Sequence, residues 1–358
     1  MPNKISTTPL THGERYRSVL KDKKPRVYQK IQEYLADLNS PQRVCSIDIA
    51  YDWSCNMQCT HCFTTLLQDK TRRASKFTLE SLKKVCDEAD AMGVFAISLQ
   101  GGEPLFWGDL EDIIRTIGPD RFTISIVTNG VFLDKPMAEK LKALGVDRMC
   151  LSIDSGNARE HDRFRNYPGS FQKCMEAVDH CLAIGLTPHI HTVVTHTSLY
   201  SDGFNYILKY SKERNLGITV LIAIPAGEWC GNTSDLITEE DAKYIQKLHE
   251  QYPLLRRDIT AVNNVDTGCR AVSYALYITA EGEVLPCPFL HFTLGNAFVT
   301  PLKDILAKGH RVKEFHDYSP KCLAGEDKDF IKKYMSKTFG VKDLPLKVED
   351  VFSLDPLE

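Results

Sequence analysis

The sequence predicts an α/β fold in which parallel strands are joined by helical crossovers. Strand-like and helical runs alternate between residues 43 and 251, which gives six β–α units. Hydrophobic residues make up 43% of the 358 residues, enough to bury a sizeable core. Six units are too few for a closed eight-stranded barrel. The alternation stops near residue 252, so we expect a smaller domain to follow.

The first 40 residues are expected to form a helical lead-in. Val27, Ile31, Tyr34 and Leu35 recur at helical spacing after Pro25. The polar stretch before Pro25 is expected to be disordered or loosely packed. It contains no apolar segment typical of a secretory signal, and no run in the chain approaches the roughly 18 apolar residues of a membrane span. We therefore expect a cytoplasmic protein.

Hydrophobic periodicity and local end signals predict the six β–α units. Thr78 is a good N-cap for the first of their helices, and Gly93 follows its predicted end. The predicted strands cover residues 43–51, 94–99, 122–127, 148–154, 189–194 and 218–224. The predicted helices cover residues 78–92, 110–117, 135–144, 170–184, 204–213 and 239–251.

The residues after the last unit are expected to form a separate small domain. Strand-like runs at 275–278 and 283–285 flank a turn and predict a hairpin, while 258–269 resembles a strand and a loop. The predicted domains are therefore a lead-in at 1–40, a core at 41–255 and a C-terminal domain at 256–358.

A cysteine-rich loop follows the first predicted strand. Cys55, Cys59 and Cys62 have the spacing C-x3-C-x2-C. Three thiolates can hold three irons of a [4Fe–4S] cube and leave the fourth iron open, whereas a structural zinc site needs four ligands. Two other interpretations stay open, namely a zinc site completed by His61 or three buried cysteines that only cluster.

This spacing resembles the signature of the radical S-adenosylmethionine (radical SAM) enzymes. The resemblance implies a partial (β/α)6 TIM-like barrel, a [4Fe–4S] cluster and S-adenosyl-L-methionine bound to its open iron. It also implies reductive cleavage to a 5′-deoxyadenosyl radical, with an electron donor such as flavodoxin or ferredoxin. His61 stands where the family usually has an aromatic residue. By this resemblance it helps to position the adenine, although a simple loop-filling role is the alternative.

The end of the second strand carries a second motif of this resemblance. Gly101, Gly102 and Glu103 precede Pro104 and resemble the GGEP motif, which contacts the methionine amino group in the family. Glycines allow close backbone approach, and a carboxylate can accept hydrogen bonds from an ammonium group. The combination with the cysteine loop is more specific than either motif alone.

The next two strand ends supply further candidate residues for cofactor binding. Thr128 ends the third strand, and Ser152 and Asp154 end the fourth. The resemblance assigns Ser152 to the ribose or the carboxylate and Arg165 to the carboxylate, with Arg163 as a substitute. Arginine suits a carboxylate because its guanidinium binds both oxygens. The alternative is a helix-capping Asp154 and a surface arginine.

A second cysteine set lies in the C-terminal domain. Cys269, Gly282 and Cys287 form a C-x12-G-x4-C pattern, and Cys322 follows. This pattern resembles the SPASM and Twitch extensions of radical SAM enzymes, which wrap a hairpin around an auxiliary [4Fe–4S] cluster. The single later cysteine favours the shorter Twitch form. Cys230 is a candidate for the fourth ligand, but it could instead be a thiol donor to the substrate or a core residue. Alternatively, one iron has no protein ligand and binds the substrate. A zinc-binding or core role for the second cysteine set is a further alternative.

Composition and the two resemblances together define the expected function. A net charge of −3 gives no nucleic-acid footprint, and twelve cysteines without a signal peptide favour metal binding in a reducing cytosol. The first hypothesis is a radical SAM oxidoreductase or rearrangement catalyst acting on a small molecule. A maturase that crosslinks or epimerises a ribosomal peptide is the second hypothesis, and a non-enzymatic iron–sulfur electron carrier is the third. The substrate and the catalytic residues are not predicted.

Overall fold

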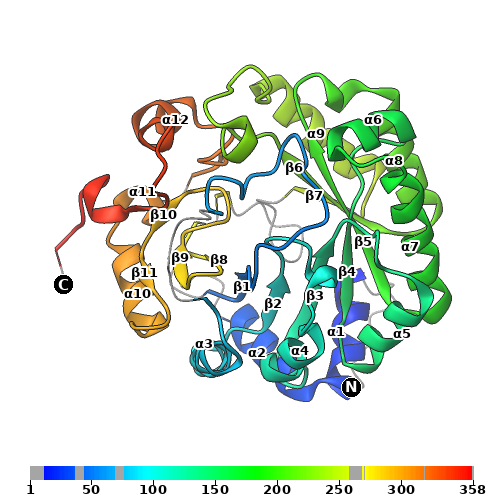
Figure 1. Cartoon of the computed structure of the whole chain (residues 1–358), viewed down its shortest axis with the longest axis horizontal. Coiled ribbons are helices and arrows are strands. Elements are labelled where there is room, and N and C mark those ends of the chain that lie inside the picture. Colours follow the sequence, from blue (N-terminus) through cyan, green and yellow to red (C-terminus); the bar gives the residue numbers. More distant parts are fainter. Residues whose placement is uncertain are drawn as a thin grey trace, which may run out of the picture.

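The computed structural model describes residues 12–36, 44–68, 76–257, 268–269, 271–317 and 319–356. Within these ranges the chain builds one ten-stranded sheet with the order β11-β9-β8-β1-β2-β3-β4-β5-β6-β7. Neighbouring strands from β8 through β1 to β7 are parallel, whereas β9 pairs antiparallel with β8 and with β11. The sheet curves without closing, as Figure 1 shows, so the prediction of a partial TIM-like barrel is confirmed.

The strands of this sheet are short, and most of them end where the sequence places functional residues. Their bounds are β1 Ser46–Ile49, β2 Ala96–Leu99, β3 Thr123–Thr128, β4 Arg148–Ser152, β5 Thr187–Val194, β6 Gly217–Ile222, β7 Leu255–Arg257, β8 Ala275–Ile278, β9 Glu283–Leu285 and β11 Gly295–Asn296. Two further strands, β10 Phe292–Thr293 and β12 Leu346–Lys347, form a separate parallel pair.

Helices follow each of the strands β1 to β6 and cover the outer face of the sheet (Figure 1). They are α3 Leu79–Ala91, α4 Leu110–Ile117, α5 Lys135–Ala143, α7 Ser170–Ile184, α8 Asp202–Glu213 and α9 Glu239–Gln251, with the additional α6 Ala158–Arg165 after β4. The six predicted β–α units are therefore confirmed. The predicted cap is confirmed as well, because Thr78 and Ser81 form a reciprocal capping box at the start of α3.

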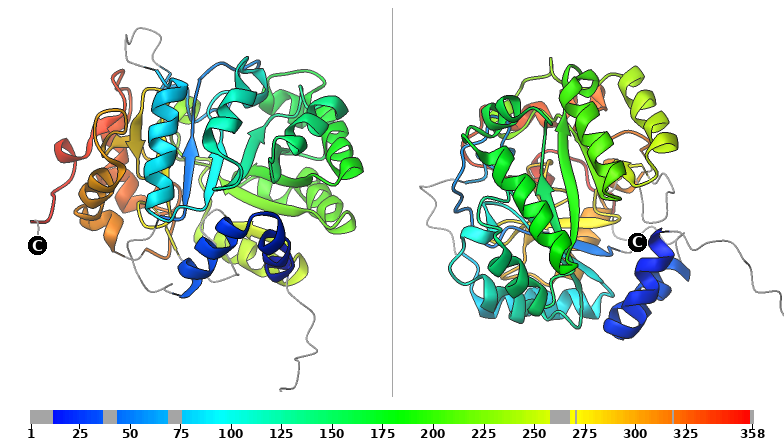
Figure 2. Two further views of the ribbon diagram at one scale, coloured as in Figure 1. Left: turned by 90° about the horizontal axis from the view of Figure 1, so that it is seen from below. Right: turned by 90° about the vertical axis from the view of Figure 1, so that its right-hand side faces the viewer.

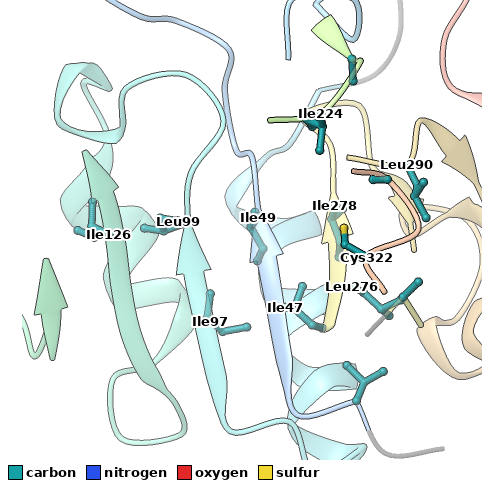
Figure 3. Packing of buried hydrophobic residues seen from close by; sticks show 14 of the residues in the cluster. Ile47, Ile49, Ile97, Leu99, Ile126, Ile224, Leu276, Ile278, Leu290 and Cys322 are labelled. Atoms are coloured by element: carbon teal, nitrogen blue, oxygen red, sulfur yellow. The ribbon is translucent and has the colours of Figure 1, made fainter. Parts of the chain in front are cut away.

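Alternation along each strand separates an apolar outer face from a more polar inner face. In β1, Ile47 and Ile49 are fully buried, whereas Ser46 and Asp48 point to the other side and are half-buried. Figure 3 shows Ile47 and Ile49 within a continuous row of buried aliphatic side chains from neighbouring strands. Burying each such side chain stabilises the fold by about 1.5–3 kcal/mol, so this outer row fixes the positions of the strands.

Two N-terminal helices close the end of the barrel opposite to the strand carboxyl ends (Figure 2). They are α1 His12–Lys23 and α2 Pro25–Ala36. Lys24 Nζ donates to the carbonyls of Phe122 and Gly145, just before β3 and β4, and Lys30 Nζ donates to the carbonyl of Val94. The prediction that the chain before Pro25 is disordered or loosely packed is wrong for α1, because packing against the sheet orders this polar helix.

The C-terminal part extends the barrel sheet. The predicted hairpin is confirmed, since β8 and β9 pair around a turn at 279–282. Its first strand, β8, lies beside β1, more than two hundred residues earlier in the chain. The remaining helices are α10 Leu302–His310, α11 Lys313–His316 and α12 Lys328–Lys333. The predicted strand and loop at 258–269 lie almost entirely outside the described residues.

A membrane-spanning helix has to be both long and apolar. None of the helices in the described part of the chain is both long and apolar enough to span a bilayer.

Candidate active site

A cavity of about 410 Å³ lies at the carboxyl ends of the barrel strands, between these ends and the C-terminal segment. This is the edge at which parallel α/β barrels place their active sites. Residues from β1 to β6 and from the segments around both cysteine sets line the cavity. All six predicted cysteine ligands contribute to its wall, namely Cys55, Cys59, Cys62, Cys269, Cys287 and Cys322.

The first cysteine loop is held by backbone contacts from two sides. The N–H and the hydroxyl of Thr60 both donate to the carbonyl of Phe164, at 3.1 and 3.0 Å, which fixes the loop to α6. On the other side, the N–H of Glu228 donates to the carbonyl of Cys62 at 2.9 Å. Gly227 has a φ of +60°, and a Cβ there would overlap the Cys62 carbonyl oxygen. The loop therefore requires glycine at this contact.

The thiols of this loop share the cavity wall without forming a finished ligand set. Neighbouring protein atoms partly desolvate Cys55 and raise its pKa although the residue is exposed, and burial raises the pKa of Cys59, so both are protonated thiols in the metal-free chain. Among the described residues, no group of three or more His, Cys, Asp or Glu side chains is spaced to hold a metal ion. The donors fit an iron–sulfur cluster by type and number, and they would have to lose their protons to bind one.

Glu103 is buried at the end of β2 and is surrounded by neutral donors. Its carboxylate accepts hydrogen bonds from the Thr128 hydroxyl at 2.7 Å, the Asn129 N–H at 2.8 Å and the Leu105 N–H at 3.1 Å. Burial still raises the pKa of Glu103 to about 7. An ammonium group in the cavity would stabilise the ionised carboxylate.

The two glycines before Glu103 allow the chain to approach itself. A Cβ on Gly101 would overlap Ala50, and a Cβ on Gly102 would overlap the carbonyl of Ser54. These glycines let the end of β2 press against the segment that leads into the cysteine loop. They also line the cavity, as predicted for residues near the cofactor.

Arg165 and Asp154 form a buried ion pair beside the first cysteine set. Arg165 Nε donates to Asp154 Oδ2 at 2.7 Å, and the N–H of Val193 donates to Asp154 Oδ1 at 3.0 Å. Burial opposes the charge of Asp154, but the Arg165 guanidinium outweighs it and lowers the pKa of this carboxyl. Arg165 lines the cavity, whereas Arg163 is exposed and Asn157 caps α6 in place of Asp154.

The three other predicted cofactor residues also border the cavity. Thr128 and Ser152 are buried at the ends of β3 and β4. The ring of His61 stacks on Phe164, with centroids 3.9 Å apart and an interplanar angle of 11°. Burial lowers the pKa of His61 to about 3, so the ring is neutral, and its Nδ1 has no hydrogen-bond partner within the described ranges. The roles of these residues stay predictions.

Backbone hydrogen bonds bring the second cysteine set together from three segments. The N–H of Cys269 donates to the carbonyl of Ser319 at 2.7 Å, which places Cys269 next to the segment of Cys322. The N–H of Val272 donates to the carbonyl of Pro286 at 3.1 Å, which places the same segment next to Cys287. Cys322 is buried and belongs to the same hydrophobic cluster as Ile278 of β8, and Figure 3 labels both residues.

An ion pair connects Cys322 to the far edge of the barrel. Arg257, at the end of β7, donates from both terminal nitrogens to the carboxylate of Glu326, at 3.1 and 2.7 Å. The same carboxylate accepts a hydrogen bond from the N–H of Cys322 at 2.8 Å. Gly325 packs against Ile222 of β6. The Cys322 loop therefore lies across the open side of the barrel. The other candidate ligand, Cys230, is half-buried and does not line the cavity.

The inner face of the barrel supplies polar residues that the motifs did not identify. The cavity lining includes Ser46 and Asp48 from β1, Ser98 from β2, Gln100 just after it, and His191 from β5. The alternation of polar Ser46 and Asp48 with Ile47 and Ile49 was the available signal. It indicates a polar inner face but not which of its residues meets a ligand.

Comparison with known proteins agrees with this site. Residues 54–207 match the family model described as the radical SAM superfamily, and residues 269–326 match that of an iron–sulfur cluster-binding domain, SPASM. An AdoMet-dependent heme synthase of Nitratidesulfovibrio vulgaris is 25% identical over 301 residues, covering 75% of this chain and 81% of the relative. A probable GTP 3′,8-cyclase of Methanocella arvoryzae is 30% identical over 183 residues, covering 50% of this chain and 57% of the relative.

The fold is also similar to a solved structure. Streptococcus suis SuiB bound to S-adenosylmethionine matches with a TM-score of 0.58 and 18% identity, over 78% of this chain and 69% of SuiB. SuiB bound to its precursor peptide SuiA matches with a TM-score of 0.60 and 17% identity, over 86% and 72% of the two chains. At this identity the similarity supports the fold alone.

Proposed function

Because this chain belongs to the radical SAM superfamily and carries a C-terminal iron–sulfur cluster-binding domain, we propose that it is an oxidoreductase acting on a C–H bond of a small molecule. The observation that carries the proposal is the shared cavity. Cys55, Cys59 and Cys62 line it together with the second cysteine set. A substrate in this cavity can therefore contact the S-adenosylmethionine site and the auxiliary cluster site at the same time.

When bound, the [4Fe–4S] cluster and S-adenosylmethionine supply the radical that removes the hydrogen atom. The chain's own residues bind and orient the cofactor. Glu103 holds the ammonium group, because its buried carboxylate has neutral donors and space for a cation. Arg165 holds the carboxylate, because it is the arginine that lines the cavity. Asp154 keeps the Arg165 side chain in place through the 2.7 Å ion pair.

The presence of a second cysteine set favours a net two-electron oxidation of the substrate. An auxiliary cluster held by Cys269, Cys287 and Cys322 would supply an acceptor for the second electron of such an oxidation, and the accompanying proton would pass to water. The two cysteine sets line the same cavity. Flavodoxin or ferredoxin is proposed as the donor of the electron that starts the cycle.

A small molecule is the substrate class that the relatives favour. Both curated relatives named above carry small-molecule names, heme synthase and GTP 3′,8-cyclase. The relative that is bound to a peptide is similar in fold alone.

Anaerobic reconstitution tests the proposal by counting iron. We expect about eight irons in the intact chain and about four in the Cys269→Ala/Cys287→Ala variant, because each cube holds four. Cys86→Ala/Cys181→Ala is the matched control, since both cysteines are buried in the core away from the cavity, and it should keep about eight. An unchanged count in the first variant would remove the auxiliary cluster from the proposal.

The same preparation distinguishes an enzyme from an electron carrier. Under dithionite, an enzyme cleaves S-adenosylmethionine to 5′-deoxyadenosine and methionine, whereas an iron–sulfur carrier does not. Absence of 5′-deoxyadenosine from a preparation with eight irons would contradict the proposed enzyme.

A further inference from the structure

We propose that Asp48 binds a positively charged amino group of the substrate at the floor of the cavity. This inference rests on the proposed function, because it takes the cavity at the strand carboxyl ends to be the substrate site. It adds a substrate class, namely an amine attached to an apolar body.

The position of Asp48 places it between the two cysteine sets. It lies on β1, whose neighbours in the sheet are β2 on one side and β8 on the other. Its register partners are Ser98 on β2 and Tyr277 on β8. β2 leads to Glu103, and β8 belongs to the hairpin that carries Cys287. A ligand group bound to Asp48 therefore lies between the proposed cofactor and the second cysteine set.

Asp48 is a half-buried residue on the cavity lining, and the partners of its carboxyl group are all neutral. Its hydrogen bonds come from the side chains of Gln100 and Ser98, and both of these residues also line the cavity. Among the described residues that line the cavity, Arg165 is the single lysine or arginine, and it is paired with Asp154. His191 is held neutral, since burial lowers its pKa to about 4. Within the described ranges no cation is paired with Asp48, although Arg148 acts on the neighbouring Cys150 thiol.

This arrangement is costly unless a ligand completes it. An ionised carboxylate inside a protein needs a cation or several hydrogen bonds to offset the loss of water. Burial accordingly raises the pKa of Asp48 to about 7. The nearby titratable groups, the Tyr277 phenol and the Cys150 thiol, do not supply a positive charge. A protonated amine provides the missing charge and up to three donors.

The walls above Asp48 define the rest of the ligand. Trp229, Leu221, Ile224 and Phe289 line the cavity with apolar surface. On the β8 side, Ala275 is the register partner of Ser46 and also lines the cavity. A ligand that satisfies both features has an apolar or aromatic body with an amine at one end.

Binding of three matched probes tests this inference on the anaerobically reconstituted protein. The probes are phenethylamine, which is cationic, 2-phenylethanol, which is neutral and of nearly equal size, and 3-phenylpropionate, which is anionic. Calorimetry should give the wild-type protein a Kd for phenethylamine at least tenfold lower than for either other probe. Equal affinities for the amine and the alcohol in the wild-type protein would overturn the proposal.

Substitutions of Asp48 test whether its carboxylate causes the preference for the amine probe. Asp48→Asn should abolish the tenfold preference for the amine and change the Kd for 2-phenylethanol less than twofold. Asp48→Glu keeps the charge and should therefore retain a preference for the amine. This second variant still tests the role of the charge if Asp48→Asn folds poorly. If Asp48→Asn folds and keeps the wild-type preference, the assignment to Asp48 is wrong.

Two measurements on the same samples separate this inference from the proposed function. The iron content and the dithionite-driven formation of 5′-deoxyadenosine report on the proposed enzyme and do not require the amine. A preparation that cleaves S-adenosylmethionine but shows no amine preference overturns the inference alone. A preparation with eight irons that prefers the amine and cleaves no S-adenosylmethionine overturns the proposed function alone.

Discussion

At the scale of single residues, Glu103 is the side chain whose environment most clearly calls for a cationic ligand. It is 2% exposed, and its three hydrogen-bond donors are neutral. Charge-assisted hydrogen bonds contribute about 1.5–3 kcal/mol, roughly 10- to 150-fold in affinity. A bound ammonium group is therefore expected to depend strongly on this carboxylate.

Glu103→Gln should weaken S-adenosylmethionine binding at least tenfold and lower 5′-deoxyadenosine formation by a similar factor below saturation. The amide keeps the size of the side chain but removes the charge. Equilibrium dialysis under anaerobic conditions measures the affinity. Glu111→Gln is the control, since Glu111 is on the outer surface of α4 and pairs with Arg115, and its affinity should equal that of the wild type.

The sequence identified Glu103 and the first cysteine loop because each motif is local. A few consecutive residues contain the whole signal, so no knowledge of packing is needed. The ion pair between Asp154 and Arg165 was not predicted, because it depends on the direction in which α6 leaves β4. Asp48 was missed for a related reason: its isolation from cations becomes visible only when the residues from the other strands are placed around it.

At the scale of elements, the turn after β6 supports the first cysteine loop. This turn contains the short 3-10 helix Gly227–Trp229, and its backbone contacts Cys62. No local motif predicts this contact, because it joins two loops more than 160 residues apart. The positive φ of Gly227 and the closeness of the Cys62 carbonyl both exclude a larger residue.

Gly227→Ala should therefore displace the cysteine loop and lower the iron content of the first site. The expected result is a fall from about eight irons to about four in the reconstituted chain. Gly169→Ala is a matched control, because Gly169 also has a positive φ of +84° but a Cβ there meets nothing within 4 Å. If both variants lose iron equally, backbone strain rather than the contact with Cys62 is responsible.

The link between α6 and α7 depends on Asp162. Its carboxylate accepts hydrogen bonds from the N–H groups of Gly169 and Phe171, at 2.6 and 2.8 Å, and from the Ser170 hydroxyl at 2.9 Å. Burial acts to raise the pKa of Asp162, but these hydrogen bonds outweigh it and lower the pKa below the ordinary value of 3.8. Folding therefore favours the ionised form.

The contribution of Asp162 to stability should be complete above about pH 4 and should disappear as the pH falls through its lowered pKa. Asp162→Asn should reduce the free energy of unfolding by about 1 kcal/mol at pH 7. Urea denaturation at pH 7 and at steps down to pH 3 measures this difference, which should shrink toward zero. Asp179→Asn, on the exposed side of α7, is expected to change stability little at any of these pH values. A difference that stays constant with pH would contradict the role of the charge.

At the scale of the whole molecule, the alternation of strands and helices predicted the barrel, because each β–α unit is local in sequence. The sequence could not predict that β8 joins the barrel sheet beside β1, since two strands so distant in sequence carry no mark of their pairing. The link across the open side of the barrel was also invisible. It depends on Arg257 of β7 meeting Glu326 beside Cys322.

Arg257→Gln should release the Cys322 loop and reduce the occupancy of the auxiliary site. Loss of one partner of a buried ion pair costs about 3–5 kcal/mol, because the other charge is left uncompensated. The reconstituted variant should contain about four irons and keep the ability to cleave S-adenosylmethionine. Lys321→Gln removes the exposed ion pair with Glu239 one residue from Cys322, and it should keep about eight. Equal iron in both variants would show that Arg257 does not support Cys322.

The parallel pairing of β8 with β1 joins the two cysteine-bearing parts of the chain through one sheet. It places the strand before the first cysteine loop next to the first strand of the hairpin that leads to Cys287. The relative placement of the two thiol sets is therefore a property of the folded chain, present before any cofactor or substrate is bound.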